Sequence, residues 1–387
     1  MNDEREKKPI TLTDGEPRMS TYLNTKGVRL GLPVSGTFEL TARCNFDCKM
    51  CYVHRQDAAA LIPRELTADQ WLSIASDARD AGLMFLLLTG GEPFIRQDFP
   101  YLWRELQKFG FKISVNTNAS LYNDELRALF REYRPTRINV SLYGGSEETY
   151  RRLCGRASYE TVVRNLRSMK QDDLPVRLNL SLTPFNVDDA QAVDAISREI
   201  GLQINAAAYM YPPVRVTGRT GENAGRFEPE QAGKVLARWA YLRDGAERTM
   251  QRAALIREKK AAAMANHCAD PEQEGVLCRA GRSAFWMTWD GRMLPCGTMD
   301  VEASYPLEVG FKAAWDEVRA RTAAIRLPAE CTSCPDRRNC SVCASICKGE
   351  TGRFDGKPEY VCRMTESMCR ETAAIADELS QSGKSEQ

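Results

Sequence analysis

Histidine is scarce in this sequence, whose 387 residues include only His54 and His267. This scarcity disfavours catalytic schemes built on histidine, and also zinc sites that mix cysteine and histidine ligands. The sequence also lacks an apolar run near the ~18 residues of a membrane span, and its charged N-terminus has no apolar segment of the secretory type. Together these absences predict a cytoplasmic protein without a membrane partner.

An excess of either charge is also lacking, because 53 Lys and Arg residues face 52 Asp and Glu residues. Such a balance gives no indication of binding to nucleic acid or to an anionic membrane. The length and the hydrophobic content of 43% allow one large domain with a smaller one, or two medium domains. Partners must therefore be inferred from individual sites.

Cysteine, in contrast, is abundant, with 14 residues that cluster at motif-like spacings. Disulfides are rare in a reducing compartment, and the chain is not the small secreted type that disulfides usually stabilise. We therefore expect the cysteines to bind metal as thiolates.

Six short apolar runs alternate with amphipathic helical segments in the first half of the chain. Thr67 and Gln70 predict a capping box at the start of one such helix, and Gly82 marks its end. Apolar strands that alternate with helices predict an α/β fold with a parallel sheet, open or curled into a partial barrel, whose functional loops follow the strands. The runs are residues 36–42, 84–90, 111–116, 137–143, 176–182 and 202–209.

Composition changes along the chain predict its domain organisation. The first 35 residues are polar, rich in Gly and Pro and without clear periodicity, and the last residues are polar and expected to fray. A Pro-Pro loop and a helical segment separate the strand-helix repeat from the cysteine-rich part. The predicted regions are an N-terminal extension (1–35), a core (36–210), a connector (211–265), a cysteine-rich domain (266–370) and a polar tail (371–387).

The first cysteine cluster, Cys44, Cys48 and Cys51, lies in the loop after the first strand. Its odd count is informative, because a structural zinc site is closed by four ligands and a [4Fe-4S] cluster held by four cysteines has no open iron. Three ligands leave one iron free to bind another molecule. His54 as the fourth ligand of a zinc site is the alternative at this point.

This loop resembles the signature of the radical S-adenosylmethionine (SAM) superfamily, a Cys-x3-Cys-x2-Cys loop after the first strand of a partial βα barrel. The resemblance covers about residues 36–210 and implies a partial (β/α)6 parallel barrel of radical SAM type. It also implies that Cys44, Cys48 and Cys51 hold a [4Fe-4S] cluster whose open iron chelates SAM. Reductive cleavage of SAM then yields a 5'-deoxyadenosyl radical that abstracts hydrogen from a substrate, while the protein supplies position and a shielded cavity.

Residues at the ends of later strands also match the family. Residues 90–93, Gly-Gly-Glu-Pro, match a family motif that holds the amino group of SAM. The glycines allow the backbone to approach SAM closely, and the carboxylate of Glu92 can pair with the ammonium group. Met50 stands where the family often has an aromatic residue beside adenine, and methionine is apolar and polarisable enough for that role. The SAM-binding residues that the resemblance implies are Met50, Tyr52, Gly90, Gly91, Glu92, Pro93, Asn116, Asn118 and Ser141.

The C-terminal cysteines resemble the SPASM domain, which carries auxiliary [4Fe-4S] clusters in peptide- and protein-modifying radical SAM enzymes. Within about residues 268–365, the resemblance assigns Cys278, Cys296 and the crossing ligand Cys343 to a first auxiliary cluster, with Cys268 or Cys347 as a candidate fourth ligand. Two zinc ribbons with four thiolates each are the alternative interpretation. The second auxiliary cluster is assigned Cys331, Cys334, Cys340 and Cys362.

Some further residues are weighed individually. Cys154 is expected to be a small buried residue and Cys369 a thiol on a helix face. Tyr209, Tyr211 and Arg215 follow the sixth run and are candidates to line a substrate cavity. Acidic residues near that cavity are too numerous for a general base to be chosen, so the catalytic residue stays unknown.

A SPASM domain implies a peptide or protein substrate, most often a ribosomally made precursor peptide that a radical step crosslinks. The predicted partners are this substrate, a reductant such as flavodoxin or ferredoxin, and a separate leader-binding protein, because about 35 residues before the first strand are too few for a leader-binding domain. An anaerobic sulfatase-maturing enzyme, which makes formylglycine, is the enzymatic alternative. A non-catalytic Fe-S electron carrier or zinc scaffold is the alternative of another class, and it would not cleave SAM.

Overall fold

The computed structural model describes residues 18–53, 58–214, 225–265, 275–299 and 301–385. Within them, one eight-stranded sheet has the order β6-β5-β4-β3-β2-β1-β7-β8. All neighbouring strands are parallel except β7 and β8, which are antiparallel. The strands are β1 (Ser35–Glu39), β2 (Phe85–Thr89), β3 (Lys112–Thr117), β4 (Arg137–Ser141), β5 (Val176–Ser181), β6 (Gln203–Ala207), β7 (Ala284–Met287) and β8 (Met293–Leu294).

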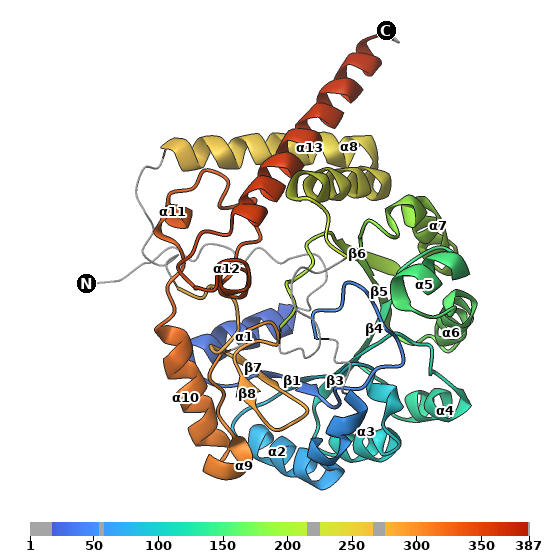
Figure 1. Ribbon diagram of the computed structural model, residues 1–387, viewed down its shortest axis with the longest axis vertical. Helices are drawn as coiled ribbons and strands as arrows, with labels where there is room; N and C mark the ends of the chain where they lie inside the picture. The colour runs from blue at the N-terminus through green and yellow to red at the C-terminus, as the bar shows by residue number, and fades with distance from the viewer. Residues whose placement is uncertain (1–17, 54–57, 215–224, 266–274, 300, 386–387) are drawn as a thin grey trace.

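Helices follow the strands and cover the outer side of the curved sheet (Figure 1). The Thr67–Gln70 capping box is present at the start of α2, and Trp71 and Ile74 on its apolar face are buried. The predicted α/β fold with a parallel sheet is therefore confirmed. The covering helices are α2 (Ala68–Asp80), α3 (Phe99–Gln107), α4 (Asp124–Glu132), α5 (Glu147–Cys154), α6 (Tyr159–Gln171) and α7 (Ala190–Ile200), with the 3-10 turns η1 (Ala58–Arg64), η2 (Pro93–Ile95) and η3 (Val187–Asp189).

The strands alternate between an apolar outer face and a polar inner face. In β4, for example, Ile138 and Val140 are fully buried against the helices, whereas Asn139 and Ser141 on the other face are partly exposed. The core therefore lies between the sheet and the helices, and the concave side of the sheet is available for ligands.

Three segments differ from the expectation. Residues 18–30 of the expected extension form helix α1 (Arg18–Leu30), whose Asn24 accepts hydrogen bonds from Ser35 and Ser283 at the starts of β1 and β7. The cysteine-rich part adds β7 and β8 to the sheet beside β1. The expected frayed tail is instead helical as far as Ser385, as part of α13 (Glu359–Ser385).

The C-terminal half is mostly helical. The long helix α8 (Pro229–Ala265) changes direction at Gly245, whose φ of 78° is left-handed, and α13 packs against it (Figure 1). A second, smaller apolar core surrounds buried Cys331 and Cys347. The remaining helices are α9 (Pro306–Val309), α10 (Phe311–Ala323), α11 (Ala329–Thr332) and α12 (Ala344–Thr351). In the part of the chain described here, no helix is both long and apolar enough to span a membrane.

Candidate functional site

A cavity of about 370 Å³ lies at the carboxyl ends of the parallel strands, and we call it the upper cavity. Ends of parallel strands converge at one edge of a sheet, which is where such folds place their ligands. The residues that line it include Cys44, Cys48, Cys51, Met50, Tyr52, Gly90, Gly91, Asn116, Asn118, Ser141, Tyr209 and Tyr211.

The three cysteines of the first cluster are partly buried at this cavity. Burial raises the pKa of the Cys44 thiol far above its usual range, and the nearby Glu92, Cys48 and Cys51 raise it further. The backbone N–H of Phe46 donates to the Cys44 sulfur at 3.4 Å and acts in the opposite direction. Three thiolates crowded here need positive charge, which iron ions would supply.

Among the described residues, no three Cys, His, Asp or Glu side chains converge as the ligands of a single metal ion do. A [4Fe-4S] cluster does not need such convergence, because each of its thiolates binds a different iron. The three sulfur side chains around a partly apolar cavity therefore fit a cluster with an open iron. His54 lies outside the described residues.

The glycine pair packs against the cysteine loop. The N–H of Gly91 donates to the carbonyl of Thr41 at 2.9 Å, and the N–H of Glu92 donates to that of Arg43 at 2.8 Å. A Cβ added to Gly91 would lie 2.3 Å from the Arg43 carbonyl oxygen, and one added to Gly90 would lie 2.8 Å from that of Thr41. The glycines thus let two loops of the site approach each other directly.

Glu92 and Pro93, although predicted to contact SAM, are buried and do not line the upper cavity. The Glu92 carboxylate accepts from the Thr117 hydroxyl at 2.8 Å and from the backbone N–H groups of Asn118 at 2.7 Å and Phe94 at 3.2 Å. Burial raises the pKa of Glu92 to about 7, although these three donors favour the carboxylate. In this arrangement the side chain connects two loops of the site.

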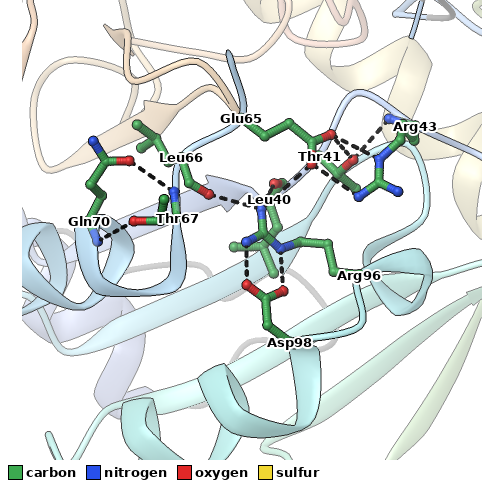
Figure 2. A network of polar contacts seen from close by, with 9 residues as sticks. All are labelled: Leu40, Thr41, Arg43, Glu65, Leu66, Thr67, Gln70, Arg96 and Asp98. Carbon is green, nitrogen blue, oxygen red and sulfur yellow. Dashed lines mark hydrogen bonds and ion pairs between the residues drawn. The ribbon is translucent and has the colours of Figure 1, made fainter. Parts of the chain in front are cut away.

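A buried arginine connects the ends of β1, η1 and η2 (Figure 2). Arg96 donates to the carbonyl oxygens of Leu40 at 2.9 Å and Leu66 at 3.1 Å, and its guanidinium forms a two-pronged ion pair with Asp98 at 2.8 and 2.6 Å. Its Nη1 also lies 3.8 Å from the Glu65 carboxylate.

Glu65 continues this network toward the cysteine loop (Figure 2). Its carboxylate accepts from Arg43 at 3.2 and 3.1 Å and from the hydroxyl of Thr41. Arg43 immediately precedes Cys44, so the network fixes the start of the loop that carries the three cysteines. Neither Glu65 nor Arg96 has a sequence signal of its own, because their pairing depends on how three separate loops meet.

The other residues predicted to bind SAM lie at the upper cavity. The amide of Asn118 donates to Asn45 at 2.9 Å and lies 3.9 Å from the Cys44 sulfur, and Asn116 accepts from Asn139 at 2.8 Å. Ala207 and Met210 also line the cavity. Sequence reasoning did not select these two, and their only signal is a position at or just after the end of a strand. Arg215 lies outside the described residues.

The structure brings Cys278, Cys296 and Cys343 together as a second group. Burial raises the pKa of Cys343, and Cys278 and Cys296 raise it further. Cys278 and Cys296 also line a cavity of about 680 Å³ beside α1 and β7. The candidate ligand Cys268 lies outside the described residues.

Cys331, Cys334, Cys340 and Cys362 form a third group. Burial raises the pKa of Cys331, and the nearby Cys340 and Cys334 add to this rise. Burial also raises the pKa of Cys362, to about 11, and Cys340 and Cys331 contribute to that rise. Cys347 is fully buried in the small apolar core that also contains Cys331 and Cys340. Burial raises its pKa to about 12, and thiols of both groups, those of Cys331, Cys343 and Cys340, contribute to the rise.

The two remaining thiols of the described residues are buried on helices. Cys154 is fully buried at the end of α5, as expected for a small core residue. Cys369 is a buried thiol on one face of α13.

Residues 38–196 match the family model described as the radical SAM superfamily. The AdoMet-dependent heme synthase of Methanosarcina barkeri is 24% identical over 347 residues, which are 84% of this chain and 94% of that protein. The probable GTP 3',8-cyclase of Metallosphaera sedula is 31% identical over 165 residues, 42% of this chain. That second match spans about half of the relative, 51% of its length.

Two solved structures resemble most of the chain. Streptococcus suis SuiB bound to its precursor peptide SuiA has a TM-score of 0.64 at 16% identity, covering 92% of this chain and 83% of that one. The protein anSMEcpe bound to AdoMet and the Kp18Cys peptide has a TM-score of 0.64 at 14% identity, covering 90% of this chain and 99% of that one. At such identities the likeness establishes a shared fold.

Proposed function

Since residues 38–196 match the radical SAM superfamily, we propose that this chain cleaves SAM reductively and abstracts a hydrogen atom from a peptide. In this proposal the reaction matures a ribosomally synthesised peptide by crosslinking. When bound, the [4Fe-4S] cluster and SAM supply the 5'-deoxyadenosyl radical of this chemistry. The observation that carries the proposal is the convergence of Cys44, Cys48 and Cys51 on a cavity at the carboxyl end of the sheet.

In this proposal the chain positions and shields the reacting groups. Cys44, Cys48 and Cys51 hold the cluster, and Gly90 and Gly91 present backbone groups to the methionine part of SAM. Asn116, Asn118 and Ser141 offer amides and a hydroxyl to its polar parts, while Met50 and Tyr52 offer apolar surface. Tyr209 and Tyr211 close the cavity on the side of the C-terminal half.

Two auxiliary [4Fe-4S] clusters belong to the same proposal. Cys278, Cys296 and Cys343 would hold the first, with Cys268 or Cys347 as the fourth ligand, and Cys331, Cys334, Cys340 and Cys362 would hold the second. The grouping of these thiols in the structure supports the assignment.

A peptide substrate is supported by the shared fold with SuiB and anSMEcpe, both of which have been solved with bound peptides. The proposal places the enzyme in the cytoplasm, with flavodoxin or ferredoxin as reductant and a separate protein as leader-binding partner. A sulfatase-maturing activity would use the same cavity and differ in its protein substrate.

A second candidate is the modification of a heme precursor. It is favoured by the similarity to the heme synthase of M. barkeri, which extends over 84% of this chain. The two candidates differ in the molecule that is modified, and mass spectrometry would find the changed mass in a peptide for the first and in a tetrapyrrole for the second.

The test is anaerobic reconstitution with iron and sulfide, followed by incubation with SAM and dithionite and an assay for 5'-deoxyadenosine. We expect about 12 iron atoms per chain, four for each cluster, and 5'-deoxyadenosine that is lost in Cys48→Ala. Stoichiometric zinc without 5'-deoxyadenosine would contradict the proposal and favour a zinc scaffold.

A further inference from the structure

The loop between Cys334 and Cys340 holds buried polar atoms that have no hydrogen-bond partner. Among the described residues, seven side-chain nitrogen or oxygen atoms are buried in this way, and three of them lie within residues 336–339. They are Oδ1 of Asp336, Nε of Arg337 and Nδ2 of Asn339. Proteins rarely leave a buried polar atom without a partner, because it has lost its hydrogen bonds to water. Three such atoms in one loop indicate that a further group contacts it.

The backbone of this loop is fixed beside the cysteines of the third group. The N–H of Arg337 donates to the carbonyl of Cys334 at 3.0 Å, and the N–H of Cys340 donates to that of Arg337 at 3.4 Å. The N–H of Asn339 donates to the carbonyl of Asp336 at 2.9 Å, so the loop is a tight turn. Arg337 and Asn339 are therefore held on a turn that joins two of the predicted cluster ligands.

The acidic residue of the turn is paired with a helix. Oδ2 of Asp336 accepts from the ammonium group of Lys260 on α8 at 2.9 Å. Burial raises the pKa of Cys369 on α13, Asp336 raises it further, and Lys260 lowers it. The carboxylate therefore lies beside α8 and α13, where Lys260 balances its charge and anchors the turn.

The cation of the turn, in contrast, acts on the third group of thiols. Burial raises the pKa of Cys331, and the positive charge of Arg337 opposes that rise. A [4Fe-4S] cluster held by four thiolates carries negative charge on sulfur atoms that accept hydrogen bonds, and such bonds help to set its reduction potential. The unpartnered guanidinium nitrogen of Arg337 and amide nitrogen of Asn339 are both donors, so they suit such an acceptor.

We propose that Nε of Arg337 and the amide of Asn339 donate hydrogen bonds to the sulfur atoms of a [4Fe-4S] cluster on the third group of cysteines, and so raise its reduction potential. This inference rests on the proposed function in assigning a cluster to these cysteines. The reduced cluster carries one more negative charge than the oxidised cluster, so both donors stabilise the reduced state more. A higher potential favours the acceptance of an electron by this cluster.

The experiment is a redox titration of the reconstituted full-length protein, followed by electron paramagnetic resonance, without SAM or substrate. The potential that belongs to the third group is identified as the one missing from Cys362→Ala. We expect Arg337→Met and Asn339→Leu each to make this potential more negative. The expected shift corresponds to about a tenfold change in the reduction equilibrium, which is about 59 mV for one electron. The other two potentials should not change.

Arg338 provides the matched control, because it is the neighbouring cation of the same loop and is exposed. Arg338→Met removes the same charge and should leave all three potentials unchanged. Unchanged potentials in both Arg337→Met and Asn339→Leu would overturn the inference, and would be expected if bound water accepts from the two donors. An equal shift in Arg338→Met would also overturn it, since a surface charge would then have the same effect.

The iron content of each variant checks that its clusters are present, at about 12 iron atoms per chain. Loss of four iron atoms in both Arg337→Met and Asn339→Leu would overturn the inference, because the two side chains would then hold the loop and not set a potential. Two variants at different positions keep the titration available if one of them alone fails to bind its cluster.

This test and that of the proposed function have separate outcomes. Potentials that shift as expected in a protein that forms no 5'-deoxyadenosine would support the two donors and contradict the SAM chemistry. Formation of 5'-deoxyadenosine in a protein whose potentials stay unchanged in both variants would contradict the two donors alone.

Discussion

The buried carboxylate of Glu92 illustrates how one residue joins two loops of the site. One of its oxygens accepts from the N–H of Phe94 and the other from the N–H of Asn118. A glutamine in its place has only one side-chain oxygen, so its NH2 group, itself a donor, must face one of these two fixed N–H donors. We therefore expect Glu92→Gln to lower the free energy of unfolding by about 1–3 kcal/mol, because a buried backbone N–H would lose its acceptor.

Urea denaturation of the protein without iron or SAM measures this change. Glu378→Gln is the matched control, since Glu378 is exposed on α13 and should change stability by less than about 0.5 kcal/mol. Equal midpoints for the two variants would show that the Glu92 contacts contribute nothing to stability.

Arg96 provides a second test at the residue scale, in the network that Figure 2 shows. Arg96→Lys keeps the charge but cannot pair with Asp98 through two nitrogens while also donating to the carbonyls of Leu40 and Leu66. We expect a loss of about 2–3 kcal/mol in the free energy of unfolding, from the buried groups left without a partner.

The chain contains a matched control for this substitution. Arg353 forms the same two-pronged pair with Asp355, two residues later, but its side chain is 73% exposed. Arg353→Lys should therefore leave the urea midpoint nearly unchanged, because an exposed ion pair contributes little to stability. A cost for Arg96→Lys no greater than that for Arg353→Lys would contradict a structural role of the buried pair.

At the scale of elements, the core of the fold could be predicted from local pattern. The six apolar runs coincide with β1 to β6, and the capping box of α2 is formed as its residues indicate. The loop with Cys44 and the glycine pair were identified because their spacing is local in sequence. These features depend on neighbouring residues, which is the information that a sequence pattern contains.

The elements that were missed depend on contacts between distant segments. Helix α1 is fixed by Asn24, which bonds to Ser35 and to Ser283, 259 residues away. Strand β8 has only two residues, which is too short to give a sequence pattern. The polar end of α13 is helical because part of it packs on α8, as the burial of Thr372 and Ala376 indicates. Such tertiary contacts override the weak local signal.

The contact between α8 and α13 itself gives a test. A Cβ added to Gly233 of α8 would lie 2.3 Å from the carbonyl oxygen of Met364 on α13, so the two helices approach at this glycine. We expect Gly233→Ala to lower the free energy of unfolding by about 1–3 kcal/mol, because the helices must separate.

Gly349 of α12 is the matched control for this effect. Its added Cβ would make only an ordinary contact, 3.6 Å from Pro212, and alanine favours a helix over glycine. Gly349→Ala should therefore leave stability unchanged or raise it by up to about 1 kcal/mol. Similar losses in both variants would mean that the close approach of α8 and α13 is not the cause.

At the scale of the whole molecule, one continuous sheet joins the two cysteine-rich halves. β7 and β8, which come from the C-terminal half, extend the sheet from β1, whose following loop carries Cys44. Tyr52, Tyr211, Tyr209 and Tyr360 then form a series of aromatic contacts, with ring centroids 5.9, 5.0 and 5.7 Å apart, from the first cysteine loop to the start of α13. The C-terminal half is therefore packed against Tyr209, one of the residues that line the cavity at the mouth of the barrel.

This packing leads to a prediction about the second group of thiols. Cys343 lies with Cys278 and Cys296, which are far from it in sequence, so its loss should remove one cluster and leave the other two. We expect reconstituted Cys343→Ala to hold about 8 iron atoms against about 12 for the unmodified chain, four fewer for the missing cluster. Cys154→Ala, which removes a fully buried core thiol, should keep about 12. If Cys343→Ala kept the full iron content while Cys347→Ala lost a third of it, Cys347 would be the residue that crosses between the two groups, in agreement with the thiols of both groups that contribute to its raised pKa.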